Sequence, residues 1–301
     1  MSASGGPLWR GVFQAELSMR SHVSWRASGA AARAYTPCDR ADLAAFLSCL
    51  RADEPLLVVG LGSNLLIRDG GYSGTVIFLH GVLRELRVEG DCCFAEAGVA
   101  SPKLARFAAN NGFVEAEFLA GIPGTVGGAL AMNAGCYGGE TWRYVERALM
   151  MKRNGELIER GPEDFATAYR HVGLKAATDE LFVGAWFRFP RGDGVAARER
   201  IRELLEKRIA TQPLNLPNAG SVFRNPPGDH AARLIEAAGL KGRTEGGAQV
   251  SEKHANFIVN RGGAASSTAI EMLIGQVQAV VAEKFGVELI REVRIVGDFV
   301  H

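Results

Sequence analysis

Two glycine-rich segments are the part of this sequence best suited to chemistry. One reads GLGSN at residues 60–64, and the other reads GIPGTVGGA at residues 121–129. Backbone N–H groups in tight glycine turns form concave anion sites, because glycine adopts positive φ angles and has no Cβ to obstruct a phosphate. Either segment alone is more often a simple bulge or turn. The two together, both rich in hydroxyl or amide side chains, predict a bound diphosphate.

The signatures of several enzyme classes are absent from the sequence. The segment at residue 60 begins like a dinucleotide-binding fingerprint, but it lacks the third glycine and no helical pattern follows. There is no Walker-type phosphate loop, no GxSxG elbow and no HExxH zinc pair. The six histidines are scattered and the five cysteines form no CxxC pair, so we expect neither a metal site nor a disulfide framework.

Length and composition indicate a soluble globular protein of two or three domains. The chain has 301 residues, of which 47% are hydrophobic and 22% charged, as is ordinary for a folded protein. Its formal net charge of +1 gives no basic field that would attract nucleic acid or anionic lipid. We expect no signal peptide, because residues 1–13 lack a long apolar core, and the sequence has no run of about 18 uncharged apolar residues. We therefore expect a cytoplasmic protein without a nucleic-acid, membrane or obligatory protein partner.

Hydrophobic periodicity predicts a mixture of helices and strands that must position the glycine segments. Residues 121–139 hold too many glycines for a regular helix or strand, so a long loop is expected there. Asn154 and Gly155 predict a tight turn between two strands. Helices are expected to begin at Asp42 and Ser101 and to cover 196–210, 230–239 and 266–285, and strands are expected at 56–60, 75–79, 85–90, 93–98, 144–153, 181–190, 254–260 and 287–297.

The motifs around the glycine segments resemble those of a known family. GLGSNLLIRDGGYSG and GIPGTVGGALAMNAGCYGGE are similar to the flavin-binding domain of the vanillyl-alcohol-oxidase (PCMH) type. With PNAGSVFRNP, AGLKG, GGAQVSEKHANFIVN and REVRIVG, they closely resemble the UDP-N-acetylenolpyruvoylglucosamine reductase family over roughly residues 23–297. The resemblance implies an α+β fold with an N-terminal extension at 1–22, a split FAD-binding domain of two subdomains at 23–191, and a C-terminal α+β substrate-binding domain at 192–301.

The same resemblance implies an activity and its cofactors. The family reduces UDP-N-acetylglucosamine enolpyruvate to UDP-N-acetylmuramate with NADPH, for peptidoglycan precursor synthesis. Some relatives of the fold tether FAD through a histidine in the first glycine loop, whereas this chain has Ser63 and Asn64 there, so non-covalent FAD is expected. By resemblance the cofactor-binding residues are Gly60, Gly62, Ser63, Asn64, Leu65, Gly121, Ile122, Pro123, Gly124, Thr125, Gly127, Gly128, Asn133, Ala134 and Gly135.

Three residues match the family's catalytic motifs. Hydride addition to the substrate leaves an enolate-like centre that must be stabilised and then protonated. The resemblance makes Ser221 the proton donor and places Glu292 near the substrate carboxylate, acting either protonated or paired with a cation. Arg170 would hold that carboxylate with two parallel hydrogen bonds. The family often has a serine where this chain has Val172, which leaves a surface arginine as the alternative for Arg170.

The spacing of the motifs indicates which form of the family this chain resembles, and their positions suggest hydrogen-bond donors for the nucleotide end of the substrate. About fifty residues separate Arg170 from Ser221, which leaves little room for the tyrosine-bearing loop that one form of the family carries, so the shorter form is expected. The candidates for nucleotide binding by motif position are Arg224, Asn225, Lys241, Lys253, His254 and Asn256.

Two alternative functions remain open at this point. Another FAD-dependent oxidoreductase of the same fold would share the glycine segments but not the motifs GSVFRNP and EVRIVG. A non-catalytic flavin or sugar-nucleotide-binding module would not need Arg170, Ser221 and Glu292 together. Both alternatives are therefore less favoured than the reductase.

Overall fold

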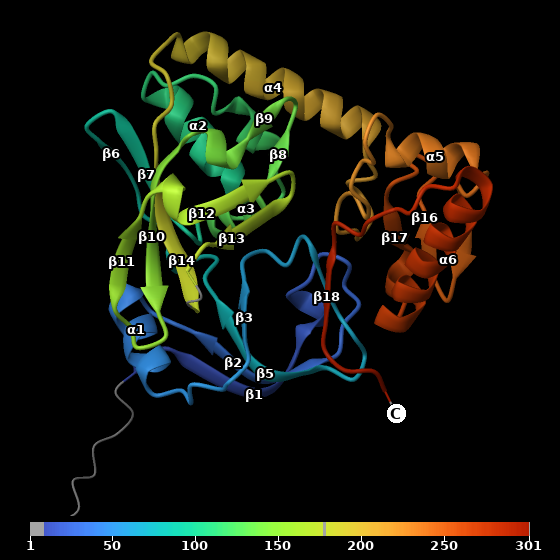
Figure 1. The fold of residues 1–301 in the computed structure, drawn as a ribbon, viewed down its shortest axis with the longest axis horizontal. Coiled ribbons are helices and arrows are strands. Elements are labelled where there is room, and N and C mark those ends of the chain that lie inside the picture. The colour runs from blue at the N-terminus through green and yellow to red at the C-terminus, as the bar shows by residue number, and fades with distance from the viewer. Residues whose placement is uncertain (1–8, 177–178, 301) are drawn as a thin grey trace, which may run out of the picture. The chain divides into compact units, whose positions relative to one another are not determined.

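The computed structural model describes residues 9–176 and 179–300, which form a mixed fold of helices and strands (Figure 1). These residues divide into two units. Unit 1 comprises 9–14, Arg33–Gly60 and Gly74–Leu205, and unit 2 comprises Ala15–Ala32, Leu61–Ser73 and 206–300. Both units are discontinuous in sequence, and the single domain boundary expected at residue 191 stays a prediction.

Unit 1 contains a five-stranded antiparallel sheet in the order β11-β10-β14-β7-β6 (Figure 1). Gly155, at φ 83°, turns the chain between β10 and β11, which confirms the predicted hairpin. Its strands are β6 (Leu86–Glu89), β7 (Cys92–Glu96), β10 (Val145–Lys152), β11 (Leu157–Arg160) and β14 (Glu180–Phe187).

Both faces of strand β7, which lies between β14 and β6, are buried. Cys93 and Ala95 belong to one hydrophobic core, whereas Cys92 and Phe94 belong to another. This alternation follows from the two-residue period of a strand. The first core also contains residues of α2 (Ser101–Asn110) and the second contains residues of α1 (Arg40–Ser48), so β7 is covered on both sides.

Helix α1 begins slightly earlier than the sequence indicates. The side chain of Asp39 accepts a hydrogen bond from Asp42 N, so Asp39 is the N-cap and Asp42 lies in the first turn. The carboxylate of Asp42 is buried and accepts from the Tyr35 hydroxyl at 2.7 Å. The expected start at Asp42 was therefore wrong by two residues, because the helix begins at Arg40. Helix α2 begins at Ser101 as predicted.

A second sheet has the order β1-β2-β5-β3. Within unit 1, β3 runs parallel to β5 with Leu57 opposite Val76, and both residues are buried. The predicted strands at 56–60 and 75–79 are thus present. The four strands are β1 (Val12–Ser18), β2 (Ala30–Thr36), β3 (Leu56–Val59) and β5 (Tyr72–Phe78).

The long loop expected at 121–139 is wrong in part, because it contains helix α3 (Val126–Met132). A Cβ added at Gly127 would lie 2.9 Å from the Ala97 Cβ, so glycine at this position permits the helix to pack closely against Ala97. That tertiary contact outweighs the low helix propensity of glycine. Two short strands follow, β8 (Gly135–Cys136) and β9 (Gly139–Glu140).

Unit 2 is organised around helix α6 (Ser267–Phe285), which the sequence predicted closely. Ser266 Oγ accepts from Ala269 N at 3.0 Å at its start, and Gly286 ends it at φ 67°. Apolar residues at helical spacing, including Ile270, Leu273 and Val277, bury this helix in the core of unit 2. The other elements of this core are α5 (Ala231–Ala237) and the antiparallel strands β15 (Thr244–Glu245), β16 (Ala248–Val250) and β17 (Ile258–Asn260).

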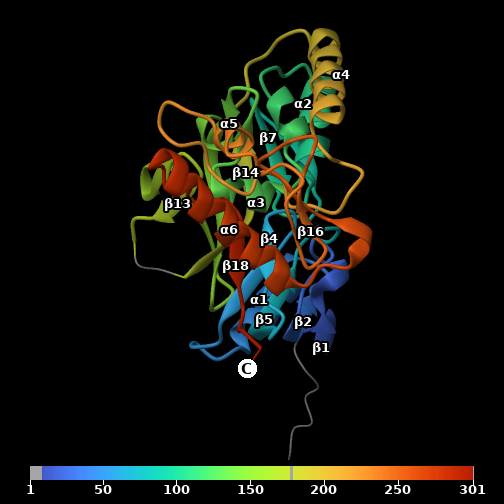
Figure 2. The same cartoon turned by 90° about the vertical axis from the view of Figure 1, so that its right-hand side faces the viewer.

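The strand expected at 287–297 is shorter in the structure. Only β18 (Arg294–Val296) is regular, and it runs parallel to β4 (Leu65–Ile67), beside which it lies in Figure 2. The preceding residues bond to a different segment, because Glu292 N donates to Val222 O and Arg224 N donates to Ile290 O. The strand predicted at 254–260 is likewise confined to β17.

The remaining elements connect these parts. Helix α4 (Gly194–Thr211) is the charged helix predicted at 196–210. None of the helices in the described ranges is long and apolar enough to cross a bilayer. The others are the hairpin strands β12 (Phe165–Ala168) and β13 (His171–Leu174) and the 3₁₀ turns η1 (Met19–Ser21), η2 (Glu117–Gly121), η3 (Thr141–Arg143), η4 (Pro162–Asp164) and η5 (Arg261–Gly263).

Candidate functional site

The two glycine segments meet at Gly60 and Thr125, which both belong to unit 1. Gly60 follows the last residue of β3, and a Cβ added to it would overlap Thr125 Oγ1. Thr125 is the N-cap of α3, with its Oγ1 3.4 Å from Gly128 N. Glycine at position 60 therefore lets the first segment approach the start of this helix.

The start of α3 offers one loosely held amide. Val126 N and Gly127 N donate to the carbonyls of Val99 and Ala97 at 2.8 and 2.9 Å, so they are already engaged. Among the described residues, Gly128 N has only the long contact to Thr125 Oγ1. Gly128 is exposed, and a Cβ added there would contact only that same oxygen, at 3.8 Å. A phosphate could therefore approach the amide of Gly128 closely.

In unit 2, the first glycine segment continues through Gly62, which has φ 61°. A Cβ there would overlap His22 O, so only glycine fits. Gly62 O accepts from Ser24 N at 3.1 Å. Ser24 Oγ is buried and has no hydrogen-bond partner among the residues that the structure describes, so it is a donor suited to a ligand.

Asn133 closes α3 and has a structural side chain. It adopts φ 42°, and it is only 3% exposed. Its amide donates to Glu140 Oε2 at 3.1 Å and to Ala168 O at 3.2 Å, while its Oδ1 accepts from Trp142 N at 3.1 Å. The sequence predicted that Asn133 contacts the cofactor. Because its side chain is engaged within the protein, only its backbone could make that contact.

Arg170 lies at the turn between β12 and β13, in the same unit as α3. It has φ 55°, and its guanidinium donates to Gly135 O at 2.6 Å and to Asn133 O at 3.4 Å. The structure thus joins Arg170 to residues 133–135, which the sequence assigned to the cofactor. This contact argues against a purely solvated surface arginine.

Ser221 and Glu292 lie on adjacent segments of unit 2. Glu292 N donates to Val222 O at 2.8 Å, and Phe223 forms an antiparallel bridge with Arg291. Ser221 is half-buried and follows Gly220, whose φ of 75° allows the turn into this segment.

The first glycine segment also contacts Glu292. Asn64 Nδ2 donates to Glu292 O at 3.1 Å, and Arg294 N donates to Asn64 O at 3.1 Å. Both residues belong to unit 2. Two residues that are 228 positions apart in the sequence are therefore linked by a side-chain hydrogen bond.

Among the predicted nucleotide-binding residues, Arg224 stands out. Its Nε is buried without a hydrogen-bond partner in the described part of the chain. A buried unpaired donor is costly, so a ligand oxygen would be favourable there. In contrast, Lys241 Nζ pairs with Glu236 at 2.8 Å, and Lys253 Nζ donates to Ile209 O at 2.6 Å. Asn225 Oδ1 accepts from Ala231 N, at the start of α5, at 3.1 Å.

His254 and Asn256 are less suited to ligand binding than their motif positions predicted. Burial, as the largest cause, lowers the pKa of His254 below its usual value, so its imidazole is neutral at pH 7. Its Nδ1 accepts from Asn256 N at 3.3 Å. Asn256 is 4% exposed, and its side-chain amide bonds to the backbone of Phe223.

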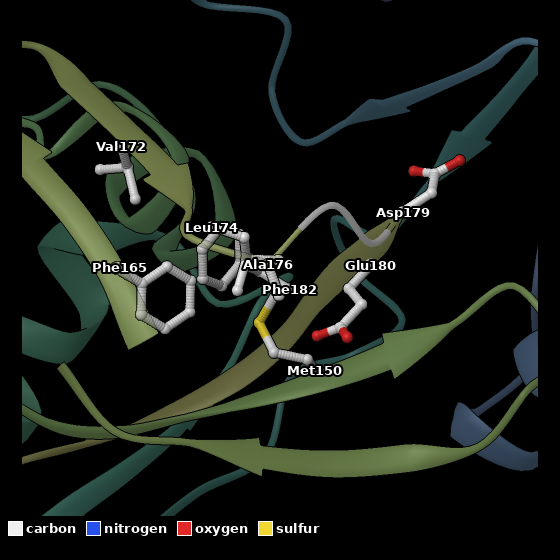
Figure 3. A pocket seen from close by; sticks show the side chains of 8 residues that line it. All are labelled: Met150, Phe165, Val172, Leu174, Ala176, Asp179, Glu180 and Phe182. Atoms are coloured by element: carbon white, nitrogen blue, oxygen red, sulfur yellow. The ribbon is translucent and has the colours of Figure 1, made fainter. Parts of the chain in front are cut away.

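A pocket of about 410 Å³ in unit 1 does not contain the predicted catalytic residues. Figure 3 shows Phe165, Leu174 and Phe182 close together on its wall. Of its two acidic residues, Asp179 and Glu180, the second has a fully buried side chain paired with Arg160 at 2.7 Å. The pocket is therefore not the candidate active site. No group of three or more His, Cys, Asp or Glu side chains in the described ranges is placed to hold a metal ion.

Two family models match separate parts of this chain. The model for the UDP-N-acetylenolpyruvoylglucosamine reductase C-terminal domain matches residues 212–296, and that for an FAD binding domain matches residues 31–161. UDP-N-acetylenolpyruvoylglucosamine reductase of Thiobacillus denitrificans is 57% identical over 99% of this chain and 97% of its own. The protein of that name from Alkalilimnicola ehrlichii is 57% identical over 93% of each chain.

A solved structure supports the fold. The crystal structure of UDP-N-acetylenolpyruvylglucosamine reductase from Thermus caldophilus matches with a TM-score of 0.80 and 30% identity, over 95% of this chain and 98% of that one. The expected α+β architecture of an FAD-binding domain combined with a C-terminal domain is therefore confirmed.

Proposed function

This chain belongs to the UDP-N-acetylenolpyruvoylglucosamine reductase family, and we propose that it reduces UDP-N-acetylglucosamine enolpyruvate to UDP-N-acetylmuramate with FAD and NADPH, as a step of peptidoglycan precursor synthesis. The observation that carries the proposal is the hydrogen-bonded pairing of the Ser221 segment with the Glu292 segment in unit 2. It brings together two residues of the family's catalytic motifs from positions 71 apart in the sequence.

The residues of the glycine segments fit FAD. Gly60, Gly62 and Gly128 stand where a Cβ would either clash with the chain or fill the approach to an amide, and Ser24 adds an unpaired buried hydroxyl. These residues would hold the cofactor through backbone donors and without a covalent bond, since Ser63 and Asn64 replace any histidine tether. The chemistry that bound FAD supplies is hydride transfer, from NADPH to the terminal methylene carbon of the substrate.

The protein itself would contribute a proton, from Ser221, and a carboxyl group, from Glu292, near the substrate carboxylate. Once hydride has reached the methylene carbon, negative charge develops at the neighbouring carbon beside the substrate carboxylate. Ser221 would donate its hydroxyl proton to that carbon, and Gly220 gives the substrate room to approach. Glu292 would act near the carboxylate in protonated form or beside a cation, because an unpaired carboxylate there would repel the developing charge.

Binding of the substrate would rely on two arginines. Arg170 would hold the substrate carboxylate, with its guanidinium plane fixed by the carbonyls of Asn133 and Gly135. Arg224, whose Nε is buried without a partner among the described residues, would bind an oxygen at the nucleotide end. Lys241, Lys253 and Asn225 already have protein partners, so they would need to exchange these for substrate.

Form and location are further parts of the proposal. Between Arg170 and Ser221 the described chain consists of β13, β14, α4 and their connections, which supports the shorter form of the family. Another FAD-dependent oxidoreductase is less favoured because the C-terminal match covers residues 212–296. A cytoplasmic location is consistent with Cys38, Cys49, Cys92 and Cys93, none of which forms a disulfide with another described residue.

The proposal is tested by product analysis of the purified protein. With NADPH and UDP-N-acetylglucosamine enolpyruvate, mass spectrometry should detect a product that is two hydrogens heavier than the substrate, and denaturation should release intact FAD. Omitting NADPH should abolish the product. If no such product forms with FAD-loaded protein, the proposed function is wrong. If flavin stays with the denatured chain, only the expectation of non-covalent binding is wrong.

A further inference from the structure

Asn256 uses its whole side-chain amide on a single neighbouring residue. Its Oδ1 accepts from Phe223 N at 3.0 Å, and its Nδ2 donates to Phe223 O at 2.8 Å. The backbone continues this link, because Val222 N donates to Asn256 O at 2.9 Å. With 4% of its surface exposed, Asn256 has little area left for a ligand.

The segment held by Asn256 follows Ser221 directly and bonds to the segment that carries Glu292. Ser221 immediately precedes the bound residues, and Val222 O accepts from Glu292 N at 2.8 Å. On the other side, Asn64 Nδ2 donates to Glu292 O at 3.1 Å. A continuous series of hydrogen bonds therefore runs from Asn256 through residues 222–223 to Glu292.

We propose that Asn256 is a positioning residue for Ser221 and Glu292 and not a ligand of the substrate nucleotide. This inference rests on the proposed function, and it departs from the motif-based prediction for Asn256. Loss of its amide would leave Phe223 N and O, both buried, without side-chain partners, so the segment would relax. A displacement of about 1 Å in a reacting group can cost about 10²-fold in rate.

Asn260 provides a matched control in the same unit. It is also buried, at 0% exposure, and its amide likewise makes one donated and one accepted bond to the backbone. Those bonds reach Trp25 O and Ala265 N, both at 2.9 Å, and neither partner precedes or pairs with a predicted catalytic residue. Asn260→Ala should therefore reproduce the stability cost of Asn256→Ala without its effect on the chemistry.

The first experiment separates the two half-reactions of FAD-loaded protein by anaerobic stopped-flow. Asn256→Ala should be bleached by NADPH at nearly the wild-type rate, but its reoxidation by saturating enolpyruvyl substrate should slow by about 10²-fold. Asn260→Ala should unfold at a lower temperature and reoxidise like wild type. Equal reoxidation rates in the two variants, or a higher substrate KM with unchanged kcat in Asn256→Ala, would overturn the proposal. Wild-type protein that never reoxidises would instead contradict the proposed function.

A second variant covers the case in which Asn256→Ala fails to fold. In Asn256→Asp, one carboxylate oxygen still accepts from Phe223 N, but only the protonated acid can donate to Phe223 O. The ratio of its reoxidation rate to that of wild type should therefore rise as pH falls. Taking this ratio removes the contribution of His254, the adjacent titratable residue that accepts from Asn256 N. A ratio that is independent of pH would count against the proposal.

Discussion

The glycine segments of unit 1 and the Ser221 region of unit 2 fix their geometry with different parts of the chain. At Gly60, Gly127 and Gly128, the decisive feature is the absence of a side chain, which lets backbones approach one another or leaves an amide open. Around Ser221, the decisive feature is a pair of side-chain amides that bond to the backbone, with the buried Asn256 bonded to Phe223 and the half-buried Asn64 bonded to Glu292. We therefore expect cofactor binding to depend mainly on backbone groups, and substrate chemistry to depend on backbone segments that side-chain amides hold in place.

This difference has consequences for mutational sensitivity. A glycine site fails when atoms are added, because there is no room or the approach is filled. A site held by amides fails when atoms are removed, because each buried backbone group left unpaired costs about 1–3 kcal/mol. Substitutions that add atoms should therefore damage the glycine segments, whereas substitutions that remove atoms should damage the Ser221 region.

The largest expected effect is at Ser221. Ser221→Ala should lower kcat by about 10²–10⁴-fold, equivalent to roughly 3–5 kcal/mol of barrier, because a positioned acid is lost. Ser221→Cys should recover part of the rate, since a thiol is more acidic than a hydroxyl. Steady-state oxidation of NADPH in the presence of substrate measures both variants. A kcat within twofold of wild type for Ser221→Ala would assign the proton to another donor.

Substitution of Arg170 should have the next largest effect. It also tests whether the cofactor region and the substrate region are separate. A guanidinium bound to a carboxylate contributes about 1.5–3 kcal/mol, so Arg170→Ala and Arg170→Lys should both weaken the enolpyruvyl substrate by about 10–100-fold. NADPH should be affected far less, because only the substrate presents that carboxylate. Titration of both ligands measures the difference.

The control for Arg170 is Arg188→Ala, which removes an exposed pair with Glu146 and should change neither ligand. Arg170 also bonds to Gly135 O and Asn133 O. Loss of FAD from Arg170→Ala would therefore show that the arginine serves the cofactor turn, against the assignment to substrate.

An alanine at Gly60 should have a moderate effect confined to the cofactor. Its Cβ would overlap Thr125 Oγ1, and such overpacking costs about 1–3 kcal/mol, or about tenfold or more in FAD affinity. Gly275→Ala is the control, because glycine there lies in α6 with nothing within 4 Å of an added Cβ. It should stabilise the protein by about 0.5–1 kcal/mol. Fluorescence titration with FAD and thermal unfolding distinguish the two variants. Unchanged FAD affinity in Gly60→Ala would contradict the expectation that FAD binding requires glycine at this position.

Asp69 provides a test of how much a side chain stabilises unit 2, because its contribution to stability should depend on pH. Burial alone would raise the pKa of Asp69, but hydrogen bonds from Thr268 and Ser267, at the start of α6, outweigh burial and lower it below the usual value. A carboxyl with a lowered folded pKa contributes stability above its unfolded pKa of about 3.9 and loses it as pH falls through the folded pKa. Asp69→Asn should thus cost about 0.3–1 kcal/mol near pH 7, the range for a negative charge beside a helix N-terminus.

Urea unfolding of Asp69→Asn and wild type between pH 3 and pH 7 measures this dependence. The difference in unfolding free energy should shrink toward the acid end, since wild-type Asp69 becomes protonated there. A difference that is constant over this range would show that the charge on Asp69 contributes nothing to the stability of unit 2.

Local features of the fold were predictable from sequence, whereas features set by distant contacts were not. Helix α6 was found because Ser266 and Gly286 mark its ends, and the β10–β11 hairpin because Gly155 favours the turn. Helix α3 was missed because Gly127 packs against Ala97, about thirty positions earlier in the sequence. Propensity alone could not identify that contact.

The candidate site divides in the same way. Residue type indicated the glycine segments, and motif resemblance supplied Arg170, Ser221 and Glu292. The role of Asn256 depends on Phe223, which is 33 residues away, so no local pattern distinguishes it from a ligand of the substrate. Ser24 was missed because nothing in its neighbourhood marks it, and its proximity to Gly62 is visible only in the folded chain.

The most direct test is the rate at which reduced, substrate-mixed Ser221→Ala reoxidises under anaerobic conditions. If cofactor binding and substrate protonation are carried by separate regions, this variant should bind FAD fully and bleach with NADPH at nearly the wild-type rate. Its reduced flavin should then persist after the enolpyruvyl substrate is added, with reoxidation slower by about 10²–10⁴-fold. Reoxidation at the wild-type rate, or loss of NADPH-driven bleaching, would contradict that separation.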